Sequence, residues 1–358
     1  MNILAIESSC DETAAAVIQN GRHILSNVVV SQIDIFAAYG GVIPEIAARS
    51  HLEAILPVVH QALTEAHCTW DDIHSIAVTH TPGLLGSLLV GTLTARTLAI
   101  LHHKPLYPVH HLKSHIYACW LNAEKPPKFP VLSLVISGGH TQIIYMPNHN
   151  EFQIIGTTRD DAVGECFDKV AKILGLPYPG GPSIAAAATH GDPRKYHFPH
   201  PHLTHPARSG NNSATPSLDF SFSGLKTAVL REVQKSVGKS ISFPSHDLAP
   251  LLTSQQIHDF AASFQQTATD ILLEKLQLAL QQHPDTQSIV FAGGVSANQL
   301  LRSEAAKQFP SIEVFFPQPK FSGDNAAMVG AAAFYEIQSG AQPTDPYHLN
   351  IFPRSPIQ

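Results

Sequence analysis

The sequence has 358 residues, of which 44% are hydrophobic and 14% charged, and its formal net charge is −6 with the histidines neutral. This composition excludes a disordered chain, and the length exceeds what one hydrophobic core usually spans, so we expect two domains. The negative charge excludes a protein that binds nucleic acid over its whole surface. Any RNA contact must therefore use a local basic patch or a partner.

The cysteines and the apolar segments narrow the class of protein further. The four cysteines are scattered and form no CxxC pair, which argues against a disulfide framework and against a thiolate zinc site. Met1 and Asn2 lead directly into an apolar run, so we expect no signal peptide. The longest uncharged apolar stretch, 82–95, is too short to span a bilayer and is interpreted as a buried helix. We expect a soluble, cytoplasmic protein without membrane contacts.

One pattern of elements occurs twice along the chain. The strand-like runs of the first half are 3–6, 14–18, 24–30 and 75–79, and those of the second half are 131–136, 142–145, 152–155 and 288–292. In each half a polar turn follows the first run, and a glycine turn before a helix follows the last. The simplest account is two similar α/β domains that face each other across a cleft, with ligands beyond the carboxyl ends of the strands. The alternative is a set of unrelated βα loops.

Other segments indicate helices and a long loop. Apolar residues recur at helical spacing in 165–174 and in 254–281. Segment 189–216 is rich in His, Pro, Gly, Ser and Asn, which predicts a long surface loop, and such loops are often functional. Its Arg194 and Arg208 are candidate contacts for an RNA.

His111 and His115 stand four residues apart, a spacing that places both imidazoles on one face of a helix, as a metal site requires. With 22 histidines in 358 residues, about one such pair is expected by chance, so the spacing alone does not separate a metal site from two unrelated histidines. A metal site also needs a third ligand, which an acidic residue elsewhere must supply.

Paired glycines predict places where a phosphate could be bound. Pairs occur at 138–139, 180–181 and 293–294, each at a predicted strand or helix end. Without a Cβ, backbone N–H groups can approach a phosphate, although a single pair is usually an ordinary turn. Together they favour a pocket built from several loops. Asp168 either pairs with Lys172 on a helix surface or points into the cleft to bind ribose hydroxyls.

Ten motifs follow one another in an order that is more specific than any one of them. They are Ile6–Thr13, Gly41–Glu45, Thr81–Leu84, His111–His115, Ser137–Thr141, Asp161–Glu165, Tyr178–Pro182, Phe220–Lys226, Ala292–Asn298 and Asp324–Met328. In this order the chain resembles, essentially from end to end, the bacterial tRNA threonylcarbamoyladenosine transferases of the TsaD type, formerly regarded as O-sialoglycoprotein endopeptidases.

The resemblance implies a fold and a set of site residues. The fold is α/β and actin-like (the ASKHA class), with duplicated RNase H-like domains and an interdomain cleft. The N-terminal domain comprises residues 1–130 plus about 322–358, and the C-terminal, nucleotide-binding domain comprises residues 131–321. One divalent metal ion is bound by His111, His115 and Asp324, with iron favoured over zinc. The implied nucleotide contacts are Val135, Ile136, Ser137, Gly138, Gly139, Asp168, Gly181 and Asn298.

The implied activity is that of an acyltransferase in tRNA processing. The threonylcarbamoyl group of threonylcarbamoyl-AMP passes to N6 of adenosine 37, beside the anticodon, in tRNAs that read codons beginning with A, and AMP is released. Glu12 or Asp11 is the candidate for orienting or deprotonating the attacking amine. A TsaB-type paralogue and a TsaE-type ATPase are the implied protein partners.

The sequence departs from the family at two places, and three other functions stay open. His110 stands where the family usually has Asn, with Lys113-Ser114 where it often has Glu-Gly. Ala185 and Ala186 stand where many relatives have an acidic residue, which puts one ribose or substrate contact in question. A metalloprotease is disfavoured because Leu112 occupies the position of the HExxH glutamate. An ATPase or kinase of the ASKHA class would release phosphate without tRNA, and a non-catalytic scaffold is disfavoured by the complete His/His/Asp set.

Overall fold

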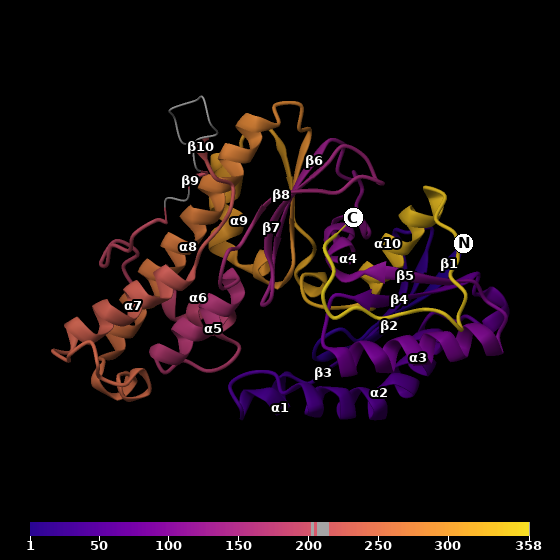
Figure 1. Cartoon of the computed structure of the whole chain (residues 1–358), viewed down its shortest axis with the longest axis horizontal. Coiled ribbons are helices and arrows are strands. Elements are labelled where there is room, and N and C mark those ends of the chain that lie inside the picture. Colours follow the sequence, from indigo (N-terminus) through magenta and orange to yellow (C-terminus); the bar gives the residue numbers. More distant parts are fainter. Residues whose placement is uncertain (202–203, 206–214, 358) are drawn as a thin grey trace.

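The computed structural model describes residues 1–201, 204–205 and 215–357 (Figure 1), and the predicted tRNA contact Arg208 lies outside them. The strands are β1 (Asn2–Glu7), β2 (Glu12–Gln19), β3 (His23–Ser31), β4 (Ser75–Thr81), β5 (Leu106–His110), β6 (Val131–Ile136), β7 (Thr141–Met146), β8 (Gln153–Thr157), β9 (Thr204–His205), β10 (Thr215–Pro216), β11 (Ser288–Ala292) and β12 (Glu313–Phe315). The α-helices are α1 (Ile33–Ala37), α2 (Pro44–Glu65), α3 (Leu85–Leu101), α4 (His111–Tyr117), α5 (Val163–Ile173), α6 (Gly180–Ala188), α7 (Ser223–Ser236), α8 (Ser254–Gln282), α9 (Gln299–Gln308) and α10 (Ala326–Gln338).

Two five-stranded sheets share one topology. The first has the order β3-β2-β1-β4-β5 and the second the order β12-β11-β6-β7-β8. In the first sheet β1, β2 and β3 are antiparallel, while β4 and β5 continue the sheet parallel to β1. In the second, β6, β7 and β8 are antiparallel, and β11 and β12 continue it parallel to β6. This correspondence confirms the predicted repeat and the actin-like α/β fold. Strands β5 and β12 extend each sheet beyond the predicted runs.

The first strand of each sheet is buried on both faces. In β1, Ile3 packs into a core shared by the two sheets, and the adjacent Leu4 packs into a core beneath α2 and α3. In β6, Val135 packs into the same shared core, whereas Leu134 packs into a third core on the far face of the second sheet. Successive side chains of a strand point to opposite faces. For this reason the sequences of both strands are apolar at consecutive positions, and apolar and polar residues do not alternate in them.

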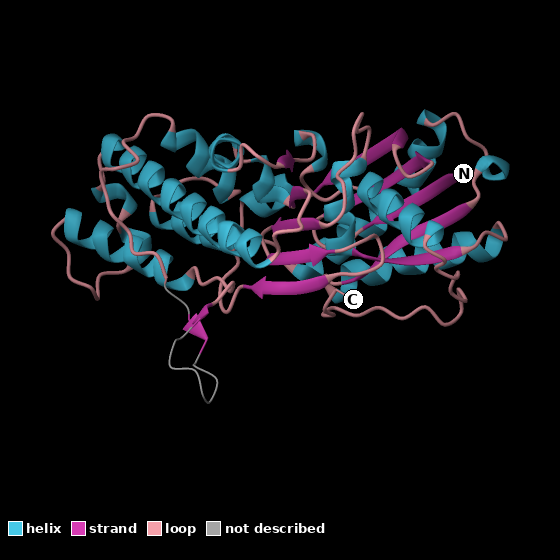
Figure 2. Ribbon diagram, turned by 90° about the horizontal axis from the view of Figure 1, so that it is seen from above, coloured by secondary structure: helices cyan, strands magenta, loops and turns pink. Residues whose placement is uncertain are grey.

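The helices form layers around these sheets (Figures 1 and 2). Helices α2 and α3 pack along the outer face of the first sheet, and α4 and α10 pack on its inner face. Helices α5, α7 and α8 cover the second sheet. The predicted helices at 165–174 and 254–281 correspond to α5 and α8 and are confirmed. Because α10 packs on β1 and β2, we propose the domain limits 1–130 plus 322–358 and 131–321.

The apolar stretch at 82–95 belongs to α3, which is buried on one face only. Leu88 and Ala95 are buried, whereas the exposed fractions of Leu85, Leu89 and Leu93 are 59%, 44% and 46%. The prediction of a helix was correct, but the prediction that the helix is buried was wrong. The apolar residues of α3 are distributed around the whole helix, and only one of its sides packs against the sheet. Among the described helices, none combines the length and apolar composition needed to cross a bilayer.

Candidate metal centre and nucleotide cleft

A cleft of about 700 Å³ opens where the carboxyl ends of several strands meet. Its walls come from turns and helix ends of both halves of the chain. They include the turn after β1 (9–12), the turn before α3 (82–84), His111 of α4, the turn after β6 (137–140), part of α5 and the loop before α10 (323–324). The duplicated topology brings these distant segments together, because equivalent turns follow equivalent strands.

Three residues at one end of the cleft form a triad that can hold one metal ion. Nε2 of His115 lies 3.1 Å from Oδ1 of Asp324, and Nε2 of His111 lies 3.6 Å from the same oxygen. One ligand atom from each residue lies within 4.8 Å of the other two. Burial opposes the ionised form of Asp324, but the adjoining imidazoles of His111 and His115 hold the pKa of its carboxyl below the usual range. The carboxylate therefore stays available as a ligand.

The chemistry of these donors fits a metal ion. The His115 side chain is 1% exposed; its Nδ1 has no hydrogen-bond partner among the described residues, and its Nε2, 3.1 Å from Oδ1 of Asp324, forms no hydrogen bond of normal geometry. A buried polar atom without a partner costs free energy, and coordination to an ion removes that cost for the nitrogen concerned. Two imidazoles and a carboxylate suit a divalent transition metal and leave coordination positions open for substrate.

Glu7, at the end of β1, holds the ring of His111 in place. Oε2 of Glu7 lies 3.2 Å from Nδ1 of His111. The carboxylate also accepts hydrogen bonds from the backbone N–H of Ser9 and from the hydroxyl of Thr79, both at 2.6 Å. A carboxylate bonded to the distal nitrogen fixes the tautomer of a metal-binding histidine and leaves the other nitrogen free to coordinate. Glu7 was not predicted from the sequence, although a buried acidic residue ending an apolar strand was a usable signal.

Asp11 and Glu12 line the cleft between β1 and β2. Glu12 accepts a hydrogen bond of 3.1 Å from the hydroxyl of Ser31. Burial, followed by the negative charges of Asp324 and Asp11, raises the pKa of the Glu12 carboxyl above its usual value. A carboxyl group with a raised pKa holds its proton to higher pH and is a stronger base once ionised, which suits it to proton exchange with a substrate.

Several glycines line the cleft where the protein itself does not require them. A Cβ added to Gly138, Gly139, Gly294 or Gly323 would meet no atom within 4 Å, and the φ angles there are ones that other residues adopt. In contrast, a Cβ on Gly164 would lie 2.6 Å from the carbonyl oxygen of Ser137. Packing therefore explains Gly164, whereas close approach of a ligand is the remaining physical reason for the cleft glycines.

Asp168 lines the cleft and does not pair with Lys172. Its Oδ1 accepts a hydrogen bond of 2.7 Å from the backbone N–H of Gly180. The lysine that forms ion pairs on this helix is Lys169, with Asp161 at 2.8 Å and Glu165 at 3.0 Å. Of the two interpretations made from the sequence, the cleft-facing one agrees with the structure.

Four of the predicted nucleotide contacts (Val135, Ile136, Gly181 and Asn298) are not part of the lining of the cleft. Val135 and Ile136 are fully buried in the cores, so they can offer a ligand only their backbone. The side chain of Asn298 caps α9, accepting from Leu301 N at 3.2 Å and donating to Gln265 at 2.9 Å. Gly181 lies in the first turn of α6. Ser137 lines the cleft, as do Gly138 and Gly139, and so does His140, which was not predicted as a site residue.

Sequence comparisons with known proteins point to one family. Residues 23–331 match the sequence model of the family TsaD, tRNA N6-adenosine threonylcarbamoyltransferase. A protein with that name from Symbiobacterium thermophilum is 48% identical over 342 residues, covering 95% of this chain and 93% of the relative. Another, from Moorella thermoacetica, is 44% identical over 360 residues, covering 99% and 97%.

Solved structures are similar in fold. HypF from T. kodakarensis has a TM-score of 0.59 at 12% identity, over 94% of this chain and 48% of that one. The activator of 2-hydroxyisocaproyl-CoA dehydratase from Clostridium difficile has a TM-score of 0.50 at 12% identity, over 95% and 96%. At these identities the likeness concerns the fold alone.

Proposed function

The chain belongs to the TsaD family of tRNA N6-adenosine threonylcarbamoyltransferases, and we infer from this that it is an acyltransferase acting on tRNA. It transfers the threonylcarbamoyl group of threonylcarbamoyl-AMP to N6 of adenosine 37 in tRNAs that read codons beginning with A. The observation that carries the assignment to this cleft is the convergence of His111, His115 and Asp324 beside glycines that leave room for a ligand. The metalloprotease alternative loses support, because Leu112 is buried in the core.

We propose that the donor lies with its phosphate against the turn after β6. A Cβ at Gly138 or Gly139 would meet no protein atom within 4 Å, so a phosphate can approach the backbone of this turn closely. Asp168 would bind the ribose hydroxyls, because its carboxylate lines the same cleft. The backbone at Val135–Ser137, together with Gly181 and Asn298, completes the proposed nucleotide set.

The proposed cofactor is one Fe²⁺ ion per chain, in preference to Zn²⁺, held by His111, His115 and Asp324. When bound, the ion supplies a Lewis acid that orients and polarises the threonylcarbamoyl group. Glu7 keeps the Nε2 atom of His111 directed at the ion, because it bonds to Nδ1 of the same ring.

The acceptor amine needs help from the protein. The lone pair on N6 of adenosine is delocalised into the ring, so catalysis depends on positioning and on stabilising charge. As N6 bonds to the carbamoyl carbon, the bond from that carbon to the phosphate oxygen breaks and AMP leaves. We propose that Glu12 accepts the proton lost by N6, with Asp11 as the alternative, because both line the cleft on the side of Asp324.

The proposed protein partners are a TsaB-type paralogue and a TsaE-type ATPase, and the proposed compartment is the cytoplasm, where tRNA is modified. Helices α2 and α3 pack against each other. Their exposed leucines support a docking surface for the paralogue. They are Leu52, Leu56, Leu85, Leu89 and Leu93, with exposed fractions between 44% and 66%. Clustered exposed apolar residues of this kind mark interaction sites.

The test of the function is nucleoside mass spectrometry. The metal-loaded chain, with its partners, is incubated with unmodified tRNA and threonylcarbamoyl-AMP, and the digested tRNA is examined for threonylcarbamoyladenosine. We expect the modified nucleoside with the wild type and none with His111→Ala. Transfer by a metal-free His111→Ala variant would refute the role of the metal, and absence of transfer by the loaded wild type would refute the function.

A further inference from the structure

The last part of the chain runs back to the mouth of the cleft. Residues 341–357, here called the C-terminal strap, follow α10 and run from the amino end of β5, where Thr344 pairs with Leu106, to the carboxyl end of β4, and both overall views place the C-terminus near the junction of the two halves. Thr344 N donates to Leu106 O at 2.8 Å, and Phe352 N donates to His80 O at 3.1 Å. Near its end, Ile357 is 4% exposed and belongs to the core between the sheets. The strap is therefore a fixed part of the structure.

Two hydrogen bonds tie the strap to the site itself. Gly83 N, in the turn that lines the cleft, donates to Pro353 O at 3.2 Å. Nε2 of His110 lies 3.2 Å from Ser355 O, while Nδ1 of the same ring accepts from Leu112 N. His110 thus donates to the strap with one nitrogen and caps the metal-binding helix α4 with the other. The strap and the metal helix are positioned by one side chain.

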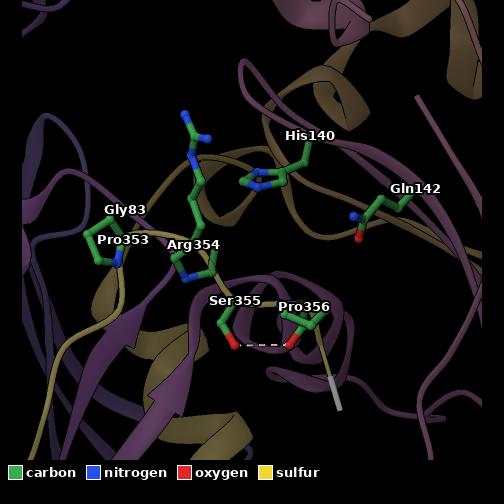
Figure 3. Close-up of a pocket in the computed structure, with 8 residues that line it drawn as sticks. Gly83, His140, Gln142, Pro353, Arg354, Ser355 and Pro356 are labelled. Atoms are coloured by element: carbon green, nitrogen blue, oxygen red, sulfur yellow. Dashed lines mark hydrogen bonds between the residues drawn. The ribbon is translucent and has the colours of Figure 1, made fainter. Parts of the chain in front are cut away.

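Residues 353–356 of the strap form a second pocket, of about 490 Å³, with Pro82, Gly83, His140 and Gln142 (Figure 3). Pro82, Gly83 and His140 also line the metal cleft. The two chambers therefore adjoin along these three residues. Adjoining chambers suit a reaction between two substrates. The acceptor can bind in one chamber and reach the reacting carbon of a donor that is bound in the other.

The charges of the two chambers differ. The metal cleft is lined by five carboxylates (Asp11, Glu12, Glu165, Asp168 and Asp324) and two lysines. The second pocket has no carboxylate in its lining, and its cation is Arg354. Figure 3 shows the Arg354 side chain extended, with its guanidinium group pointing away from Ser355 and Pro356. Arg354 is exposed and forms no ion pair with a described residue. An anion from solvent is therefore attracted to the second pocket, next to Arg354, and is repelled by the carboxylates of the metal cleft.

We propose that this second pocket is the acceptor site, and that Arg354 binds a backbone phosphate of the tRNA next to the adenosine that is modified. The proposal rests on the function proposed above and adds the side from which the RNA enters. A guanidinium group recognises phosphate through paired charge-assisted hydrogen bonds. It also provides the local positive charge that a chain of net charge −6 needs in order to hold RNA.

The test compares Arg354→Ala with Arg354→Lys and with Lys239→Ala. Lys239 is an exposed cation that follows α7, and α7 lies at the end of the molecule far from the C-terminus (Figure 1). Loss of Lys239 changes the net charge by the same amount as loss of Arg354. For the metal-loaded full chain we expect Arg354→Ala to raise the Kd for tRNA by about tenfold, and to lower the slope of log affinity against log salt by about one. Arg354→Lys should keep most of the slope, and Lys239→Ala should match the wild type. Metal content and the KM for threonylcarbamoyl-AMP should not change.

Three results would overturn the proposal. The first is an Arg354→Ala variant with wild-type tRNA affinity and salt slope, and the second is a wild-type chain that binds no tRNA. The third is a raised KM for the donor with unchanged tRNA binding, which would assign Arg354 to the carboxylate of the threonyl group. Arg354-dependent tRNA binding without any transfer by the wild type would contradict the enzymatic function and leave the RNA site intact.

Discussion

The carboxylate of Glu7 accepts a hydrogen bond from Nδ1 of His111 at 3.2 Å, which leaves Nε2 of the same ring facing Asp324. Glu7 is fully buried, and its two oxygens are also bonded to Ser9 and Thr79. The pair joins the end of β1 to the start of α4, so the metal ligand is held by the first sheet as well as by its own helix.

Changing Glu7 to Gln should weaken metal binding. The amide cannot raise the basicity of His111 as a carboxylate does, so we expect a 10- to 100-fold loss of metal affinity. Titration with a chelator, followed by metal analysis, measures it. Glu336→Gln is the control, because Glu336 pairs with Lys113 on the same helix α4 at 3.1 Å and lies away from the ligands. Equal metal affinity in Glu7→Gln and wild type would contradict the role of Glu7.

Gly139→Ala should impair nucleotide binding without affecting stability. Its new methyl group would meet no protein atom within 4 Å but would occupy space at the proposed phosphate position. We expect the affinity for AMP, measured by calorimetry, to fall, with an unchanged melting temperature. Gly164→Ala should lose stability by about 1–3 kcal/mol, because its Cβ would lie 2.6 Å from Ser137 O. If AMP bound Gly139→Ala as tightly as the wild type, the phosphate would lie elsewhere.

Glu12→Gln should slow transfer and leave binding of the adenylate intact. A general base contributes roughly 10²- to 10⁴-fold to a rate, so we expect a loss in that range in single-turnover experiments. The wild-type rate should rise with pH as the Glu12 carboxyl, whose pKa is raised by burial and by Asp324, loses its proton. The variant should lack that rise. A larger loss in Asp11→Asn than in Glu12→Gln would transfer the role to Asp11.

His51 should make the fold sensitive to acid. Its buried ring lies 2.8 Å from the Thr13 hydroxyl and 3.0 Å from the Cys10 carbonyl, and burial lowers its pKa below 6.5. His51 therefore stays uncharged in the folded protein, whereas in the unfolded chain it takes up a proton as the pH falls through 6.5. Stability from His51 is complete above that pH and is lost below it, by about 1.4 kcal/mol per pH unit.

The variant His51→Gln isolates this effect. Urea unfolding at several pH values should show the free-energy gap between wild type and variant narrowing below pH 6.5, because only the wild type loses the contribution. A gap that stayed constant down to pH 5.5 would mean that His51 does not titrate on unfolding.

Leu56→Glu on α2 should abolish binding of the TsaB-type paralogue. Its side chain is 62% exposed, so a charge there should leave the stability of the isolated chain unchanged while preventing burial in an interface. Analytical ultracentrifugation of the mixed proteins measures complex formation. Leu251→Glu, at an exposed leucine outside α2 and α3, is the matched control. A complex of wild-type affinity with Leu56→Glu would exclude this face as the docking surface.

Local patterns in the sequence were sufficient for the repeated strands and for α5 and α8. Each of these depends on residues a few positions apart, where the periods of helices and strands act directly. The same patterns could not tell which side of α3 is covered, because that depends on where the first sheet lies. Nor could they show that the side chain of Asn298 is engaged in capping α9.

Asp324 entered the predicted ligand set through the family resemblance, since no spacing rule connects it to a pair of histidines more than 200 residues away. Glu7 illustrates the same limit: it lies 104 residues from His111 in the chain and 3.2 Å from it in space. By itself the sequence determined the elements, their repeated order and the residue types at their ends. The tertiary structure alone decided which ends meet, that Glu7 supports His111, and that Arg354 lines a pocket beside the cleft, because these contacts arise only when two packed sheets bring distant segments of the chain together.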